Sequence, residues 1–319
     1  MIITVTMNAA LDRTLTVPNF QPGQRHRASG WLTLAGGKGI NIARALKRLD
    51  VPVVATGLAG GRTGAAIVSE LTREGILNDF VRIADESRTS TAVVDPTAGS
   101  FTEINEWGPD VEPSELDLLL EKLRYLARGA TGVVFAGSLP RGVEEGFYAD
   151  AIRELNRRGL QTTLDAEGQP LRSGAEAEPF LVSPNEREAE GLVGQEFHDS
   201  DDFAQALEHI ADLGPKNVLI TLTSGCYALL RDDRERVRYY AAVPRLEPIS
   251  PVGSGDVLLA GFLAARYEDR PPEEALRRAV AAGAAAVQEV GAGRFEPREI
   301  SRLEEGVRVE SLDQVASER

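Results

Sequence analysis

Four residues in the stretch 249–262, Gly253-Ser254-Gly255-Asp256, have the types and order needed to move a phosphoryl group. The two glycines let the backbone turn sharply, and the apolar run after them predicts a helix that starts at Asp256. The first N–H groups of a helix have no partner within it and attract a negatively charged oxygen. Asp256 is therefore either a helix cap or a general base beside an anion site. The stretch alone leaves both interpretations open.

A second glycine-rich segment, Gly36-Gly37-Lys38-Gly39-Ile40-Asn41, precedes a predicted helix over 42–49. It is either a tight turn with a solvated lysine or a close approach for a polyhydroxylated or phosphorylated ligand. In the second case Asn41 binds a hydroxyl group and Lys38 binds an anion. The segment is not a P-loop, because glycine and not Ser or Thr follows Lys38. No G-x-G-x-x-G pattern follows the first strand either.

Two further polar segments follow predicted buried strands. Gly137-Ser138-Leu139-Pro140 comes after the strand 132–136, where parallel sheets bind ligands, or it is a plain turn. Asn185 and Glu188 come after the strand 180–182 and are spaced to share one helical face. They are either ordinary residues of a helix start or a pair that holds Mg²⁺, mainly through water.

Composition excludes several classes of protein. Of 319 residues, 42% are hydrophobic and 26% charged, as in a globular protein. The formal net charge of −14 argues against binding to nucleic acid or an anionic membrane surface. The single cysteine, Cys226, lies in an apolar stretch and excludes an intrachain disulfide, so we expect a buried structural thiol. No signal peptide or run of about twenty apolar residues is present, and we expect a cytoplasmic protein.

The elements that must position these residues follow from periodicity. Strands are expected at 2–7, 14–17, 30–35, 53–57, 88–95, 100–105, 132–136, 161–164, 180–182 and 217–222, with a hairpin at 226–243. Helices are expected at 42–49, 63–74, 114–128, 146–158, 186–193, 201–213 and 273–289, besides the one after Asp256. This alternation predicts an α/β fold with a mostly parallel sheet and helices on both faces.

Two segments, 12–35 and 86–106, are rich in strands and lack intervening helices. The simplest arrangement is a small β lid inserted into a single domain that spans 1–319. The helix 114–128 begins with Ser-x-x-Asp, and the charged tail 300–319 is expected to be a peripheral or frayed helix.

From Thr4 to about Glu299 the sequence resembles the ribokinase-like (PfkB) carbohydrate kinases, and within them the phosphosugar-kinase branch. The resemblance rests on motifs in family order: Asn8…Asp12, Gly36 to Asn41, Arg88, Thr102-Glu103-Ile104-Asn105-Glu106, Gly137 to Pro140, Pro184-Asn185…Glu188 and Gly253 to Asp256. The chain departs from the family pattern at Ala9, at Ala136 and in the loop 222–227. None of these departures removes a residue of the base, anion-site or metal motifs.

The resemblance implies a role for each motif residue. Asp256 would be the general base, and the anion site for the transferring phosphoryl group would be formed by Gly253, Ser254 and Gly255. Sugar hydroxyls would be held by Asp12, Gly37 and Asn41. The phosphate already on the substrate would be surrounded by Lys38, Arg88, Ser138, Arg25 and Arg27. Mg²⁺ would be organised by Asn185 and Glu188, and ATP would lie along Thr223, Ser224, Gly225 and Gly283.

The implied activity is ATP- and Mg²⁺-dependent phosphorylation of a ketohexose phosphate, in the first place fructose 1-phosphate to fructose 1,6-bisphosphate. Tagatose 6-phosphate and fructose 6-phosphate are the alternative acceptors within the family. A sugar-phosphate-binding protein without turnover is the alternative from another class. The resemblance also implies a homodimer formed through the β lid, which leaves an edge or face in need of cover.

Overall fold

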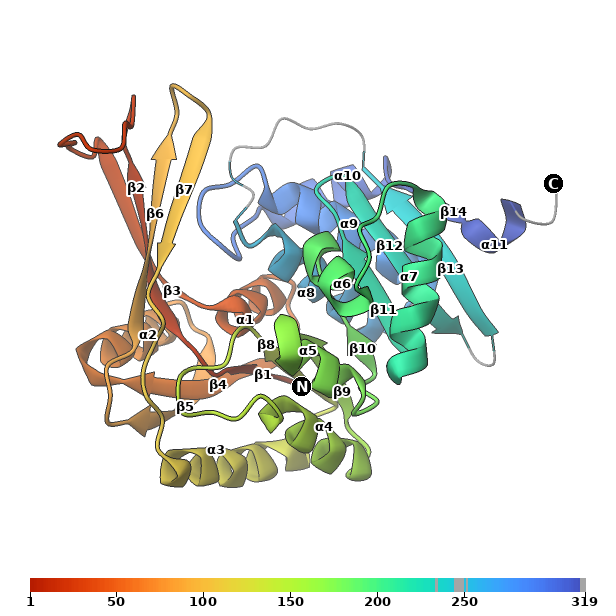
Figure 1. Cartoon of the computed structure of the whole chain (residues 1–319), viewed down its shortest axis with the longest axis horizontal. Coiled ribbons are helices and arrows are strands. Elements are labelled where there is room, and N and C mark those ends of the chain that lie inside the picture. Colours follow the sequence, from red (N-terminus) through yellow and green to blue (C-terminus); the bar gives the residue numbers. More distant parts are fainter. Residues whose placement is uncertain (233–234, 244–249, 251, 316–319) are drawn as a thin grey trace.

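The structure is a computed structural model that describes residues 1–232, 235–243, 250 and 252–315. A large sheet carries the helices, and a small sheet stands away from it (Figure 1). Ile249 and Pro251 of the glycine-rich stretch, 233–234 of the expected hairpin and 316–319 of the tail lie outside the described residues. Within the described ranges, no helix has the length and apolar character needed to cross a membrane.

The strands are β1 (Ile2–Thr6), β2 (Ala10–Thr16), β3 (Gly30–Gly36), β4 (Val53–Gly60), β5 (Leu77–Ile83), β6 (Arg88–Asp95), β7 (Ser100–Asn105), β8 (Gly132–Ala136), β9 (Gln161–Asp165), β10 (Leu181–Val182), β11 (Asn217–Thr221), β12 (Gly225–Asp232), β13 (Glu235–Ala242) and β14 (Arg308–Ser311). The helices are α1 (Lys38–Arg48), α2 (Gly61–Arg73), α3 (Pro113–Leu126), α4 (Phe147–Arg157), α5 (Gly168–Ala175), α6 (Glu186–Val193), α7 (Ser200–Leu213), α8 (Ser254–Tyr267), α9 (Pro272–Ala286), α10 (Pro297–Glu304) and α11 (Leu312–Val315).

The large sheet has the order β14-β13-β12-β11-β10-β9-β8-β1-β4-β5. Its strands run parallel from β11 to β5, and β12, β13 and β14 are joined to them antiparallel. All residues of the central strands β1 and β4 are buried, as expected for strands covered on both faces. The predicted α/β class is therefore correct.

Helices on the two faces of this sheet bury separate apolar clusters. One face is covered by α1, α2, α8, α9 and α10, and the other by α3 to α7. The helix α8 lies against both α1 and α9, so its residues 256–265 are buried on every side. A helix in this position is apolar all round, and a buried carboxylate within it calls for an explanation.

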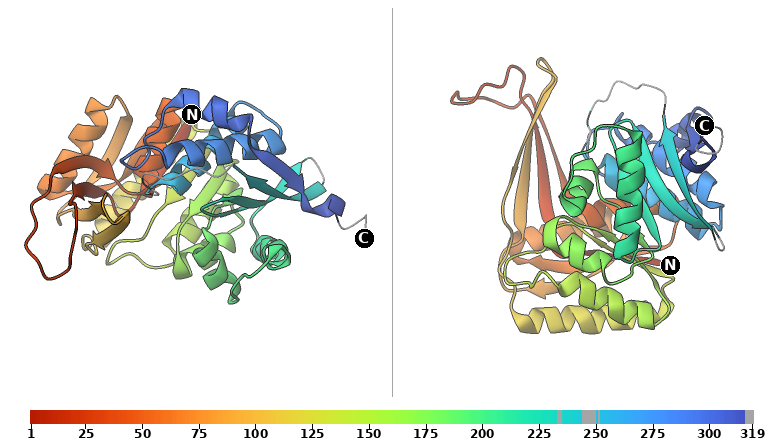
Figure 2. Two further views of the ribbon diagram at one scale, coloured as in Figure 1. Left: turned by 90° about the horizontal axis from the view of Figure 1, so that it is seen from above. Right: turned by 45° about the vertical axis from the view of Figure 1, so that its right-hand side comes forward.

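The small sheet has the order β3-β2-β6-β7 and joins two excursions of the chain. The parallel pairing of β2 with β6 brings together strands from separate parts of the sequence. The sheet projects from the body of the molecule (Figures 1 and 2). On its strands, Trp31 is 73% exposed and Ile104 63% exposed. Its four strands lie close to the expected segments 12–35 and 86–106, and the hairpin 88–95 and 100–105 has the predicted bounds.

Three predicted helix starts are wrong. The helix α1 begins at Lys38, one turn before the predicted start at 42. The helix α8 begins at Ser254 with Gly253 as its N-cap, so Asp256 lies in the first turn and does not cap the helix. The helix α3 does not start with a Ser-x-x-Asp box, because the reciprocal capping pair is Glu112 and Glu115.

Three elements were not predicted: β5, α5 and β14. Much of β5 is exposed at the sheet edge and carries polar residues, and α5 contains glycines and a proline that weaken a helical pattern. In the tail, α10 overlaps the expected peripheral helix, but the chain then forms β14, an edge strand that was not expected.

Candidate active site

A cavity of about 860 Å³ lies between the small sheet, called the lid from here on, and the edge of the large sheet where its parallel strands end. Sites for small molecules and cofactors have about this size. Most residues singled out in the sequence line it: Asp12, Gly37, Lys38, Asn41, Arg88, Asn185, Glu188, Thr223, Ser224, Gly225, Gly253, Ser254, Gly255, Asp256 and Gly283. The structure thus gathers residues from both ends of the chain around one space.

The start of α8 faces this cavity without a side-chain cap. Gly253 is the N-cap and has a left-handed backbone with φ of +76°. A Cβ atom on Gly253 would lie 2.7 Å from the Cβ of Ala292, so the position requires glycine for conformation and for space. The helix dipole and the N–H groups of the first turn favour a negatively charged group here.

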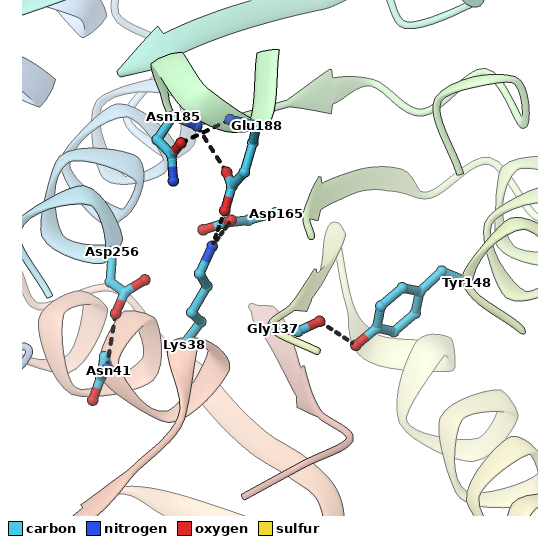
Figure 3. Close-up of polar contacts among 8 residues, drawn as sticks. All are labelled: Lys38, Asn41, Gly137, Tyr148, Asp165, Asn185, Glu188 and Asp256. Atoms are coloured by element: carbon cyan, nitrogen blue, oxygen red, sulfur yellow. Dashed lines mark hydrogen bonds and ion pairs between the residues drawn. The ribbon is translucent and has the colours of Figure 1, made fainter. Parts of the chain in front are cut away.

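Asp256 lies in that first turn and is only 6% exposed. Its Oδ2 accepts a hydrogen bond from Asn41 Nδ2 at 2.8 Å (Figure 3). Burial, and then the nearby Asp165 carboxylate, raise the pKa of Asp256 to about 7, although Lys38 and the Asn41 bond oppose the shift. A carboxyl group with a pKa near neutrality is suited to accept a proton from a hydroxyl group.

Lys38 begins α1 and points to two carboxylates rather than to open space. Its Nζ donates to Asp165 Oδ1 at 2.6 Å and to Glu188 Oε1 at 3.2 Å (Figure 3). Burial alone would lower the pKa of the Lys38 amine, but these two carboxylates raise it well above its ordinary value. The sequence suggested that Lys38 binds a substrate phosphate, and in this structure its partners are carboxylates instead.

Asn185 and Glu188 form a capping box at the start of α6. The Oδ1 of Asn185 accepts from the backbone N–H of Glu188 at 2.9 Å, and Glu188 Oε2 accepts from the N–H of Asn185 at 2.8 Å. Asn185 is therefore the N-cap and Glu188 the third residue of the helix, and both line the cavity, as expected for two residues on one side of a helix start. Burial raises the pKa of Glu188, and the Lys38 amine opposes that shift.

The sequence reasoning missed Asp165, although it completes this cluster. It is the last residue of β9, so it lies at the edge of the sheet formed by the carboxyl ends of the parallel strands, where ligands bind. Its side chain is buried. The only sequence signal was an acidic residue directly after the predicted strand 161–164. The described part of the chain holds no group of three or more Asp, Glu, His or Cys side chains arranged to bind a metal. Asp165 and Glu188 do supply two adjacent carboxylates, which suit Mg²⁺ held partly through water.

On the lid side, Asp12 of β2 and Arg88 of β6 face the cavity. Burial raises the pKa of Asp12 to about 6, and the Arg88 guanidinium opposes the shift. Arg88 donates from Nε to the backbone carbonyl of Asn8 at 3.2 Å and from Nη1 to that of Glu106 at 3.5 Å. Among the described residues it forms no ion pair with Glu86 or Glu103, so its positive charge is not neutralised by a direct partner.

Three residues expected around a substrate phosphate do not line the cavity. Ser138 accepts a hydrogen bond from Asn8 Nδ2 at 3.2 Å. Arg25 and Arg27 are exposed in the loop between β2 and β3. Their proposed contact with substrate phosphate thus stays a prediction.

The opposite end of the cavity is built by the turn 222–225 and by α9. A Cβ atom on Gly225 would lie 2.1 Å from the carbonyl oxygen of Ala241, so the turn requires glycine. On α9, Gly283 faces the start of α8, with the carbonyl oxygen of Ser254 3.3 Å from the site of a Cβ. Cys226 is buried next to this turn, and burial raises its thiol pKa, as expected for a structural thiol.

Comparison with known proteins gives a consistent match along the chain. The profile of a family described as "pfkB family carbohydrate kinase" matches residues 3–299. A relative from Borreliella burgdorferi named 1-phosphofructokinase is 32% identical over 285 residues, 89% of this chain and 91% of the relative.

Solved structures agree with the sequence match. A possible 1-phosphofructokinase from Thermotoga maritima has a TM-score of 0.89 and 26% identity, covering 98% of this chain and 99% of the other. Phosphofructokinase-2 from Escherichia coli, solved with substrates and products, has a TM-score of 0.87 and 28% identity, covering 95% and 98%. The predicted ribokinase-like fold with a separate small sheet is thereby confirmed.

Proposed function

The chain belongs to the pfkB family of carbohydrate kinases, and on that premise we propose that it transfers the γ-phosphoryl group of ATP to fructose 1-phosphate. Membership of the family makes it a sugar phosphotransferase that uses ATP. The observation that carries the proposal is the buried Asp256 carboxylate beside a helix start without a side-chain cap. The cavity also contains Arg88, a cation that an unphosphorylated sugar would not require.

In the proposed reaction the 6-hydroxyl oxygen of the sugar attacks the γ-phosphorus of ATP. The bond between that phosphorus and the oxygen bridging to the β-phosphate breaks, and ADP leaves with the electron pair. The hydroxyl proton passes to Asp256, which can accept it because its pKa is raised to about 7. The start of α8, with Gly253, Ser254 and Gly255, stabilises the negative charge on the transferring group.

The acceptor is held from the lid and from α1 in this proposal. Asp12, Gly37 and Asn41 contact its hydroxyl groups. Its phosphate is bound by Arg88, with the further cations and hydroxyl proposed from the sequence, Lys38, Ser138, Arg25 and Arg27. Arg88 is the main contact, because Lys38 would have to leave Asp165 and Glu188 to reach it.

ATP is proposed to lie along Thr223, Ser224, Gly225 and Gly283, with Mg²⁺ near Asn185 and Glu188. Asp165 is added to the metal residues because it shares the Lys38 amine with Glu188. Bound Mg²⁺ would neutralise charge on the phosphates of ATP. Both carboxylates are suited to this position, since magnesium is commonly bound through one or two carboxylates and retained water.

A panel of phosphosugars tests the choice of acceptor. We expect the highest kcat/KM with fructose 1-phosphate and ATP, measured by ADP release. A higher value with tagatose 6-phosphate or fructose 6-phosphate would replace the acceptor and leave the reaction class intact. The structural similarity to phosphofructokinase-2 makes fructose 6-phosphate the first alternative to measure. No ADP release with any acceptor, together with sugar-phosphate binding, would indicate a binding protein without turnover.

We also propose that the lid pairs with a second copy of itself. The lid exposes Trp31 and Ile104, which a partner could cover. We therefore expect a homodimer in light scattering at micromolar concentration. Replacing both residues, Trp31→Ser with Ile104→Ser, should give monomers, while Leu118→Ser on α3, also exposed but outside the lid, should leave the dimer intact. A monomeric wild-type protein would contradict the proposal.

A further inference from the structure

Arg44 lies one turn after Asn41 on α1, is 3% exposed, and uses all the N–H groups of its guanidinium. Nε and Nη2 donate to the two carboxylate oxygens of Glu74 at 2.6 and 2.9 Å. Nη2 also donates to the Ala35 carbonyl at 2.7 Å, and Nη1 donates to the Ala292 carbonyl at 3.2 Å and to Asn41 Oδ1 at 3.3 Å. A guanidinium has five N–H donors and no acceptor, and here each has a partner.

This environment determines how the Asn41 amide faces. Arg44 can only donate, so the oxygen of Asn41 must point toward it. The NH₂ group of Asn41 then points to Asp256, whose carboxylate can only accept when ionised (Figure 3). The reversed amide would place oxygen against carboxylate and NH₂ against guanidinium, and both hydrogen bonds would be lost.

Arg44 also holds the backbone that packs on the two helix starts. The Ala292 carbonyl belongs to the loop after α9, where a Cβ on Gly293 would lie 2.8 Å from the Asn41 carbonyl oxygen. The same loop packs against Gly253, the N-cap of α8. Through its bond to Ala292, Arg44 joins the start of α1 to the start of α8.

We propose that Arg44 is a positioning residue for phosphoryl transfer. By fixing the Asn41 amide, it holds Asp256 with one carboxylate oxygen occupied and the other directed to the acceptor hydroxyl. The proposal rests on the proposed role of Asp256 as general base. Small errors in such an arrangement are costly, because a displacement of about 1 Å can reduce a rate about 100-fold.

The alternative is that Arg44 only stabilises the fold through Glu74. Two variants separate these roles. Arg44→Lys keeps the charge but cannot supply five N–H groups, so it disturbs Asn41. Glu74→Gln weakens the ion pair while leaving Arg44 able to donate to Asn41. Arg48→Met, on the same helix and paired at 3.4 Å with the exposed Glu296, is the matched control.

The readouts are kcat, the pH dependence of kcat, and the thermal midpoint, with the acceptor that is best in the panel. For Arg44→Lys we expect kcat to fall about 10- to 100-fold. The acid limb of its profile, which is the fall of kcat at low pH, should move to higher pH. The hydrogen bond from Asn41 lowers the pKa of Asp256, and this variant loosens that bond. The other charged groups that act on Asp256, which are Asp165, Lys38 and Asp12, are the same in every variant. Glu74→Gln should lose thermal stability and keep the wild-type acid limb.

Wild-type kcat and acid limb in a folded Arg44→Lys would overturn the proposal, and so would an equal shift of the limb in Glu74→Gln. If Arg44→Lys does not fold, the double variant Arg44→Met with Glu74→Met removes the buried pair together, which proteins often tolerate. Wild-type kcat in that variant would also overturn it. Retained activity in Asp256→Asn would instead refute the proposed base, so the two failures are distinguishable.

Discussion

The starts of α6 and α8 carry an acidic residue at the same place and use it in opposite ways. Glu188 lies three residues after the N-cap Asn185, and Asp256 lies three residues after the N-cap Gly253. In α6 the Asn side chain and the Glu side chain bond to each other's backbone N–H groups. In α8 the cap has no side chain, and Asp256 bonds instead to Asn41 of another helix.

The residue at the N-cap accounts for this difference. A capping side chain closes a helix start on itself, and its acid then contributes to stability. Glycine leaves the start open to a ligand, and the acid is available for chemistry. Acidic residues at equal spacing from a helix start therefore do not indicate equal roles, and the following variants test the distinction.

The largest effect is expected for Asp256→Asn. Removal of the base should reduce kcat by about 10² to 10⁴-fold, as measured by ADP release, with sugar-phosphate binding nearly unchanged. Activity within a few-fold of wild type would remove Asp256 from the mechanism.

The same variant should fold at least as well as wild type. Burial raises the pKa of Asp256 from 3.8 to about 7, so its charged form opposes folding. That cost is absent below pH 3.8 and complete above about pH 7. The thermal midpoint of Asp256→Asn should thus exceed that of wild type more at pH 8 than at pH 5.

The next effect is expected for Arg88→Ala. This variant tests whether Arg88 binds the phosphate already present on the acceptor, at a site distinct from the anion site at the start of α8. Losing a buried charge-assisted contact costs about 2–5 kcal/mol, enough to raise KM for the phosphosugar more than tenfold. Any weak activity on free fructose should fall much less. Equal losses on both acceptors, or no loss on either, would indicate that Arg88 is not a phosphate ligand.

A smaller effect, a gradual fall of kcat, is expected when the pH is lowered. Since Asp256 must be deprotonated to accept a proton, kcat should fall about tenfold for each pH unit below about 7. Glu188→Gln can alter KM for ATP, but it should leave this limb in place, because Glu188 belongs to the closed helix start. A limb that moves with Glu188 would contradict the assignment to Asp256.

The smallest effect is expected for Asn185→Ala. Losing an N-cap costs about 1 kcal/mol of stability, so the thermal midpoint should fall by a few degrees. A loss of kcat comparable to that of Asp256→Asn, without a loss of stability, would show that Asn185 matters to the transfer step itself and not only to capping and to the proposed Mg²⁺ site.

Local patterns were enough to predict much of the fold and the motifs of the site. The hairpin 88–95 and 100–105 was predicted because alternating residues flank a turn that contains Gly99. The motif Gly253 to Asp256 identified the helix start that the structure places at the cavity. In these cases the physical cause lies within a few residues of the effect.

Contacts across long sequence separations could not be predicted in this way. The pairing of Lys38 with Asp165 joins residues 127 positions apart, and it reverses the expectation that Lys38 points to a substrate phosphate. Asp165 itself has no local signature beyond the end of a strand. Whether Asp256 was a cap depended on the backbone of Gly253, which the residue type permits but does not require.

The bond between Asn41 and Asp256 joins residues 215 positions apart, which has a consequence for biosynthesis. A ribosome adds about 5–20 residues per second, so about 10–40 s pass between the synthesis of the two halves of this contact. During that interval α1 is present without α8, and its apolar face has no helix to cover it. The emerging chain therefore passes through a period in which this apolar face is open to non-native contacts and the contact between Asn41 and Asp256 has not yet formed.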